Sequence, residues 1–221
     1  MRRVVAATFL SLDGVMQAPG APEEDPTSGF ALGGWTANYW DEMMGGVMAE
    51  SFASGFDLLL GRKTYDIFAA HWPHAEDDPQ IAELFNACTK YVATRSDRSF
   101  GWRNTVALRG DVAAEVARLK AADGPDLLIQ GSSQLIQTLL AHGLIDIYQL
   151  WVFPVVLGSG KRMFGSGAAP AALTLVDSKV STTGVVISTY VPAGELVTGS
   201  FALEPPNEAE LQRRRNLAKE G

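Results

Sequence analysis

Three short polar segments have the residue types and the spacing to hold a phosphorylated ligand. The first is Gly131-Ser132-Ser133, which directly follows the apolar run 126–130 and precedes leucine and isoleucine residues at helical spacing. A glycine turn lets backbone approach a ligand, and the start of a helix presents free N–H groups to an anion. Ser132 and Ser133 can cap that helix or donate to a phosphate oxygen. On its own, Gly131 is equally consistent with an ordinary strand-to-helix turn.

The second segment is Gly61-Arg62-Lys63-Thr64, which follows the apolar run 56–60 and opens a short helix. Cations are unfavourable at a helix N-terminus, so two of them there indicate an anionic ligand, with surface charges as the alternative. A P-loop is disfavoured, because five residues separate Gly55 from Gly61 and Arg62 stands where that motif has lysine. The third segment, Thr94-Arg95-Ser96, again places hydroxyl groups and a cation at the end of a predicted strand.

The elements that must position these segments alternate between strand and helix up to residue 145. Strands are expected at residues 3–10, 56–60, 90–94, 105–108 and 126–130, and helices at residues 37–52, 65–69 and 79–87, after Asp111 and after Ser133. After residue 145 we expect a long strand at residues 146–156, a glycine-rich basic loop at 157–162, and a hairpin whose strands are 172–181 and 185–192.

This pattern predicts an α/β fold with a mostly parallel central sheet, helices on both faces and a C-terminal antiparallel hairpin. In such sheets ligands bind beyond the carboxyl ends of the strands, where all three polar segments fall. A dinucleotide with an additional 2′-phosphate would use all three segments. The G-x-G-x-x-G fingerprint is absent, which disfavours an ordinary Rossmann domain.

Composition limits the classes of partner. The chain has 221 residues and a net charge of −7, which argues against a nucleic-acid-binding surface. Cys88 is the one cysteine, so no intrachain disulfide is possible, as suits a reducing compartment. No apolar run approaches the ~18 residues of a membrane span, and the run after Arg3 is expected to be a strand and not a signal peptide. His71 and His74 have no third ligand nearby, so we expect no metal site. Because neither a membrane span nor a signal peptide is predicted, we expect a soluble cytoplasmic protein.

Two stretches of the sequence resemble dihydrofolate reductases. Residues 58–65 (LLLGRKTY) resemble their second cofactor motif, and residues 127–140 resemble their strand–glycine–helix motif. Residues 145–164, which include PVVLGSGKRMF, are more similar to the reductase domain of bacterial riboflavin biosynthesis, the RibD C-terminal domain, and to its stand-alone members. The resemblance covers roughly residues 2–193. It implies a dihydrofolate-reductase-like three-layer fold in a domain of residues 1–193, NADPH as cofactor, and a tail at 194–221 with a polar helix.

The resemblance also implies roles for individual residues. The segment at the cofactor phosphates is matched by Gly61, Arg62, Lys63 and Thr64. The segment beside the adenosine and its 2′-phosphate is matched by Thr94, Arg95 and Ser96. The turn over the pyrophosphate is matched by Gly131, Ser132 and Ser133. Ala6 and Ala7 match positions near the nicotinamide. Asp13 and Gly14 match a mobile loop that closes over the nicotinamide. The acidic residue of the pterin site would fall in the predicted helix 37–52, where Asp41 is the candidate proton donor.

The sequence departs from these families at three points. Gly131-Ser132 stands where the family often has paired glycines. The serine side chain limits how closely the backbone can approach a ligand. Asp146-Ile147 stands where riboflavin reductases commonly have Asp-Glu. A deaminase domain with its zinc-binding His and Cys cluster is absent, so we do not expect the complete bifunctional riboflavin enzyme.

We therefore expect an NADPH-dependent reductase that transfers hydride to a C=N or C=O carbon of a small heterocyclic or phosphoribosylated substrate. The formal family activity is reduction of 5-amino-6-(5-phosphoribosylamino)uracil, with Asp41 or an ordered water as proton source. The alternatives are a dihydrofolate or pteridine reductase, a protein that binds NADPH without turnover, and a purely structural oligomer. A homodimer is expected from the resemblance and from the apolar stretch Trp151-Val152-Phe153, and the tail helix is either solvated or laid on a partner subunit.

Overall fold

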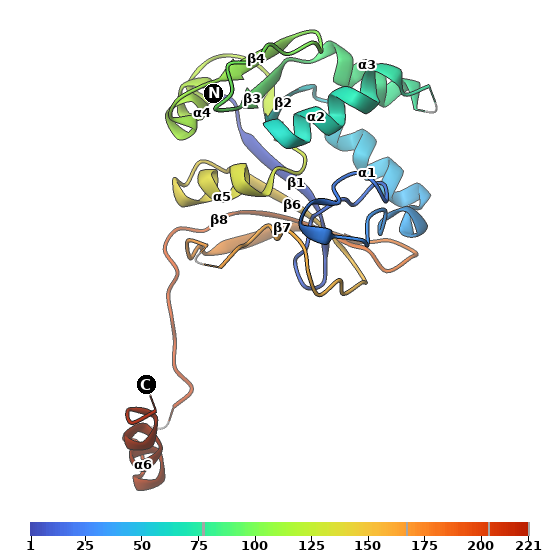
Figure 1. The fold of residues 1–221 in the computed structure, drawn as a ribbon. Coiled ribbons are helices and arrows are strands. Elements are labelled where there is room, and N and C mark those ends of the chain that lie inside the picture. Colours follow the sequence, from blue (N-terminus) through green and yellow to red (C-terminus); the bar gives the residue numbers. More distant parts are fainter. Residues whose placement is uncertain (77, 167, 203, 221) are drawn as a thin grey trace.

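A computed structural model describes residues 1–76, 78–166, 168–202 and 204–220. Its strands form one eight-stranded sheet in the order β4-β3-β2-β5-β1-β6-β8-β7 (Figure 1). The strands are β1 (Val4–Ser11), β2 (Phe56–Gly61), β3 (Lys90–Ala93), β4 (Thr105–Leu108), β5 (Asp126–Ile129), β6 (Ile147–Phe153), β7 (Leu173–Val180) and β8 (Val186–Pro192). The α-helices are α1 (Glu42–Phe52), α2 (Arg62–His71), α3 (Pro79–Ala87), α4 (Val112–Ala121), α5 (Ser133–Ala141) and α6 (Glu208–Leu217).

The pairing of the strands confirms the predicted α/β architecture. Strands β4, β3, β2, β5, β1 and β6 are mutually parallel, and β8 pairs antiparallel with both β6 and β7. Helices α4 and α5 pack on one face of the sheet, while α1, α2 and α3 pack on the other. Of the described helices, none has the length and apolar character needed to cross a membrane.

The two faces of the central strand β1 are covered to different extents. Val4, Ala6 and Leu10 point towards α4 and α5, and at most 5% of their surface is exposed. Ala7 and Phe9 alternate with them, point towards α1, and are only half-buried. Because side chains alternate along a strand, α1 therefore leaves part of this face of the sheet open beside the middle of β1.

Three predicted boundaries differ from the structure by three residues or more. The helix expected at 37–52 begins at Glu42, because residues 37–39 form a separate 3-10 turn and Asp41 is the N-cap. The helix expected from Tyr65 begins at Arg62, directly after β2. Strand β6 ends at Phe153 and not at residue 156, since Pro154 has no N–H to continue the ladder.

The apolar stretch expected to lie at a dimer surface is inside the protomer. Trp151 is 1% exposed and Phe153 is fully buried, and both pack against α1. Their burial removes the argument from this stretch for a subunit interface. The exposed large apolar side chains of the described strands lie instead on the two edge strands, at Leu175, Val176 and Val180 of β7 and at Val106 of β4.

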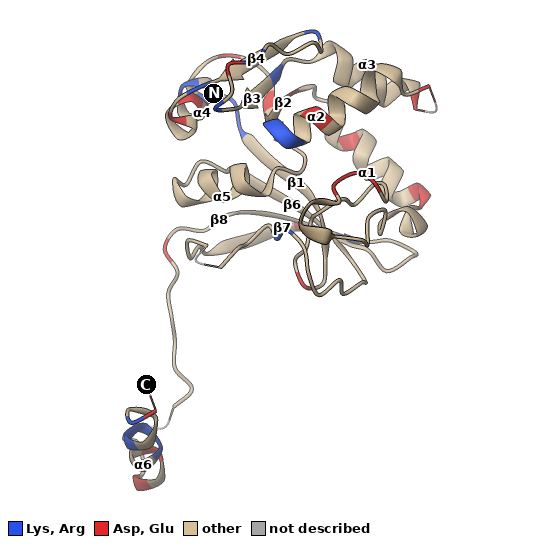
Figure 2. Ribbon diagram, in the orientation of Figure 1, with Lys and Arg blue, Asp and Glu red and all other residues tan. Residues whose placement is uncertain are grey.

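Helix α6 lies at the end of an extended segment, away from the sheet (Figure 1). It has no buried residue and carries both acidic and basic residues (Figure 2). Its charges pair within the helix, Arg213 and Arg214 with Glu210 and Arg215 with Glu208. Within this protomer α6 is therefore a solvated helix.

Candidate functional site

The order of the strands brings two of the three polar segments into contact and places the third next to them. Strand β2 lies between β3 and β5, so Thr94-Arg95-Ser96, Gly61–Thr64 and Gly131-Ser132-Ser133 follow the carboxyl ends of three neighbouring strands. We call residues 61–64 and 131–133 the turn cluster. Each of its two parts opens a helix, α2 or α5, so two helix N-termini lie side by side at this edge.

The helices of the turn cluster differ from the other four in their caps. The first N–H groups of α1, α3, α4 and α6 are capped by the side chains of Asp41, Asp78, Asp111 and Asn207. The N-cap residues of α2 and α5, Gly61 and Ser132, make no side-chain cap hydrogen bond. Uncapped N–H groups at a helix start are donors for an anion, and the helix dipole adds to the attraction. The turn cluster presents two such sets of donors.

Ser132 joins the two parts of the turn cluster. Its hydroxyl accepts a hydrogen bond from the Gly61 N–H at 2.8 Å and donates one to Thr64 Oγ1 at 2.8 Å. Its backbone is left-handed, with φ +67°, a conformation that costs a non-glycine residue about 1–2 kcal/mol. Ser132 thus links the start of α5 to the start of α2 through two hydrogen bonds.

Cations surround the turn cluster, and one carboxylate partly neutralises them. The first turn of α2 is basic (Figure 2). Arg62 pairs with Asp66 at 2.6 Å, and Arg98 pairs with the other oxygen of the same carboxylate. Lys63 and Arg95 are exposed, and neither has an ion-pair partner among the described residues. The site therefore keeps positive charge for an anionic ligand.

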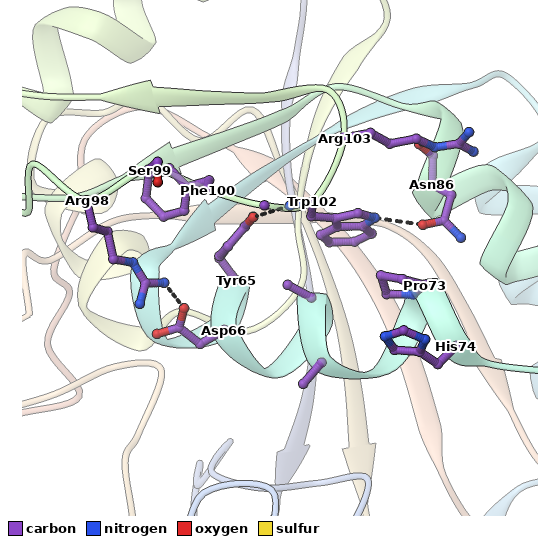
Figure 3. Close-up of a pocket in the computed structure, with 13 residues that line it drawn as sticks. Tyr65, Asp66, Pro73, His74, Asn86, Arg98, Ser99, Phe100, Trp102 and Arg103 are labelled. Atoms are coloured by element: carbon purple, nitrogen blue, oxygen red, sulfur yellow. Dashed lines mark hydrogen bonds and ion pairs between the residues drawn. The ribbon is translucent and has the colours of Figure 1, made fainter.

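A wide groove of about 910 Å³ lies on the outer side of α2, between this helix and the loop 98–103 (Figure 3). Its polar side chains mostly bind one another: Arg98 reaches Asp66, and the Trp102 indole donates to Asn86 at 2.7 Å. The aromatic rings of its floor are also engaged, since Arg98 lies over Phe100 and Lys90 over Trp102. We therefore place the candidate site at the turn cluster and not in this groove.

The open face of β1 carries a small hollow, largely apolar, that two carboxamide side chains flank. Strand pairing aligns Ala7 with Gln149 of β6, and continuing the β1–β5 register places Gln130 on the other side of Ala7. The small methyl group of Ala7 leaves a space of about 10 Å³ between the two carboxamides, roofed by Met48, Ser51 and Phe52 of α1. Gln130 lines the hollow and directly precedes Gly131, so the hollow lies one residue along the chain from the turn cluster.

Asp13 and Gly14 lie on the other side of β1, in contact with the glycine-rich basic loop 157–162. The Asp13 carboxylate accepts hydrogen bonds from the N–H groups of Leu157 and Gly158, at 3.1 and 2.9 Å, and from Ser11 Oγ at 2.6 Å. These donors, with Arg162, hold the pKa of Asp13 far below its ordinary value. The turn expected to be a mobile loop is fastened at this point, and its described contacts do not include the turn cluster.

The predicted role of Asp41 as proton donor is not supported by its surroundings. Its carboxylate caps α1 by accepting from the Met44 N–H at 2.9 Å, and it accepts from the N–H and hydroxyl of Thr182 at 2.8 and 2.7 Å. The Thr182 hydroxyl, followed by the Met44 N–H, lowers the pKa of Asp41, so the group is ionised. The predicted helix 37–52 includes Asp41, but α1 begins one residue later, and Asp41 instead ties its start to the β7–β8 turn.

Sequence reasoning missed Gln130, Gln149 and Asp66. Both glutamines stand in apolar strand patterns, and only the register of β5, β1 and β6 shows that they flank one residue. Among the described residues that line the hollow, none is titratable, and no group of described His, Cys, Asp and Glu residues is arranged to hold a metal. The arrangement suits binding of a phosphorylated ligand whose ring reaches the open face of β1.

The sequence model of one protein family, described as the RibD C-terminal domain, matches residues 2–187. The uncharacterized protein YyaP of Bacillus subtilis (strain 168) is 26% identical over 197 residues, which are 86% of this chain and 94% of YyaP.

Two solved structures share the fold. A putative riboflavin biosynthesis protein from Shewanella sp. PV-4 superposes with a TM-score of 0.60 and 22% identity, over 87% of this chain and 99% of that one. Dihydrofolate reductase from Enterococcus faecalis, complexed with NADP(H) and RAB-propyl, superposes with a TM-score of 0.55 and 14% identity. The match covers 86% of this chain and 96% of the reductase chain. These likenesses confirm the dihydrofolate-reductase-like fold class.

Proposed function

The chain belongs to the RibD C-terminal domain family, and from this membership and the turn cluster we propose that it is an NADPH-dependent reductase of a small heterocyclic or phosphoribosylated substrate. The observation that carries the proposal is the pair of uncapped helix starts, α2 and α5, which lie side by side among exposed cations. They offer N–H donors and positive charge at one edge of the sheet, as a pyrophosphate requires.

The residues present fit NADPH. The N–H groups at the starts of α2 and α5, together with Arg62, would hold the pyrophosphate, and Arg95 and Ser96 would hold the adenosine 2′-phosphate. When bound, NADPH supplies the hydride. The chain would orient the nicotinamide at the open face of β1 and exclude water with the apolar side chains around Ala7. Because no titratable described residue lines the hollow, we propose that water delivers the proton and that Asp41 does not.

The finer substrate class is part of the same proposal. The family activity, reduction of 5-amino-6-(5-phosphoribosylamino)uracil, is the first candidate, and dihydrofolate or another pteridine is the second. A protein that binds NADPH without turnover is the alternative of another class. It would share the turn cluster but leave bound NADPH unoxidised when both kinds of substrate are added.

The test is a titration of the purified protein with NADPH and with NADH, followed by nicotinamide fluorescence. We expect a preference for NADPH over NADH. Arg62→Ala should weaken NADPH binding about tenfold, which is the low end for a charge-assisted hydrogen bond because Asp66 already competes for this guanidinium. Arg118→Ala is the matched control, since Arg118 lies on α4 and pairs with Glu115. Binding of neither cofactor would refute the proposal.

We also propose that the protein is a cytoplasmic homodimer. The support from the structure is the edge strand β7, where Leu175, Val176 and Val180 are 52%, 55% and 67% exposed. An apolar sheet edge of this kind is usually covered by a partner. Elution at the volume of a monomer across a concentration series in gel filtration would remove this proposal.

A further inference from the structure

The side-chain amides of Gln149 and Gln130, which flank Ala7, differ in the hydrogen bonds that hold them in place. Gln149 has a fixed orientation: its Nε2 donates to Ser51 Oγ at 3.0 Å, and its Oε1 accepts from the Trp151 indole at 3.3 Å. Ser51 in turn donates to the Val47 carbonyl at 2.8 Å, which fixes the direction of the whole chain of hydrogen bonds. Gln149 is therefore part of the wall of the hollow.

Gln130 has no comparable partners. The one side-chain contact of its amide among the described residues is to Met48 Sδ at 3.9 Å, which is a weak acceptor at a long distance. Its amide thus has a carbonyl oxygen and a donor N–H available, in a hollow whose other lining is largely apolar. A polar group half-buried among apolar side chains gains most from a ligand that pairs with it, because solvent reaches it poorly.

The size of the hollow limits what it can receive. A space of about 10 Å³ holds about one water molecule, so it accepts the edge of a planar ring and not its body. An amide or lactam edge offers one donor and one acceptor in a plane, which matches the donor and acceptor of a carboxamide in a paired geometry. A purely apolar edge would leave Gln130 unpaired and would be disfavoured.

We propose that Gln130 positions the reacting ring by pairing with its amide or lactam edge in the hollow above Ala7. This inference rests on the proposed function, since it concerns the ring that lies beside the phosphate-binding turns. The edge has two possible sources, the carboxamide of the nicotinamide or a lactam of the substrate, and the experiment distinguishes them.

The experiment compares Gln130→Met and Gln130→Ala with the wild type, with Gln80→Met as control because Gln80 is exposed on α3, outside the turn cluster. Affinities are measured for NADPH and for 2′,5′-ADP, which has the adenosine phosphates but no nicotinamide. If the edge is that of the nicotinamide, both Gln130 variants weaken NADPH binding three- to tenfold, the range of one lost hydrogen bond, and leave 2′,5′-ADP binding unchanged.

If the edge belongs to the substrate, NADPH binding is unchanged and the KM for an accepted substrate rises three- to tenfold. Unchanged values in both measurements, or equal weakening of NADPH and 2′,5′-ADP, would overturn the role of Gln130 while the proposed function stands. Failure of the wild type to bind NADPH would overturn both. Circular dichroism and the thermal midpoint of each variant show that a lost affinity is not a lost fold.

Discussion

The serine that joins the two helix starts offers a sharp test of the site geometry. In Ser132→Ala the Gly61 N–H and Thr64 Oγ1 each lose their partner at 2.8 Å. Two hydrogen bonds at about 1 kcal/mol each predict that the free energy of unfolding falls by about 2 kcal/mol. Ser133→Ala is the matched control, because the Ser133 side chain makes no hydrogen bond to any described residue, and its effect is expected to stay within about 0.5 kcal/mol.

Ser132→Gly separates the hydrogen bonds from the backbone conformation. It loses the same two hydrogen bonds but removes the left-handed strain of a residue at φ +67°, which is about 1–2 kcal/mol. The greater conformational freedom of glycine in the unfolded chain offsets this gain in the free energy of unfolding by about 0.4–1 kcal/mol. Ser132→Gly is therefore expected to be more stable than Ser132→Ala by about 0.5–1 kcal/mol.

Equilibrium unfolding in urea, followed by tryptophan fluorescence and circular dichroism, measures both differences. The midpoints are expected to shift without a change of slope, since the surface exposed on unfolding is the same. If Ser132→Ala is as stable as Ser133→Ala, the hydroxyl does not join the two turns. If Ser132→Gly is no more stable than Ser132→Ala, the strain argument is wrong.

Four further predictions concern carboxylates and the cysteine. Asp57→Ala should lower the free energy of unfolding by about 3–5 kcal/mol, because it leaves the Arg2 guanidinium, 3% exposed, without its ion-pair partner; little change in urea unfolding would contradict this. Asp13→Asn should destabilise at neutral pH. Because the folded-state pKa of Asp13 is lowered, this difference should shrink as pH falls below the ordinary value of 3.8, as thermal unfolding at several pH values would show. Asp41→Asn should lower the thermal midpoint but leave NADPH affinity and turnover unchanged, and a loss of turnover would restore its catalytic role. Burial raises the pKa of Cys88 to about 11, so a thiol reagent should label the native protein slowly at pH 7 and the urea-unfolded protein fast.

The sequence by itself determined most of the elements and the edge of the sheet at which the three polar segments lie. Short apolar runs followed by glycine and then by helical spacing are local patterns, and they identified β2, β5 and the starts of α2 and α5. The strands before the three polar segments are parallel, so their carboxyl ends share one edge of the sheet whatever the details of packing. Whether each segment binds a cofactor remains a prediction that the titrations test.

Only the tertiary structure decided what the individual side chains do. The glutamines face one hollow because β5 and β6 flank β1 in one register, and a shift by one residue would turn either of them to the opposite face. Asp41 and Asp13 look like acids free for catalysis in the sequence, but their carboxylates accept hydrogen bonds from partners more than 140 residues away. Long-range pairing of this kind leaves no periodic trace in the chain, because it depends on which loops meet after the sheet has formed.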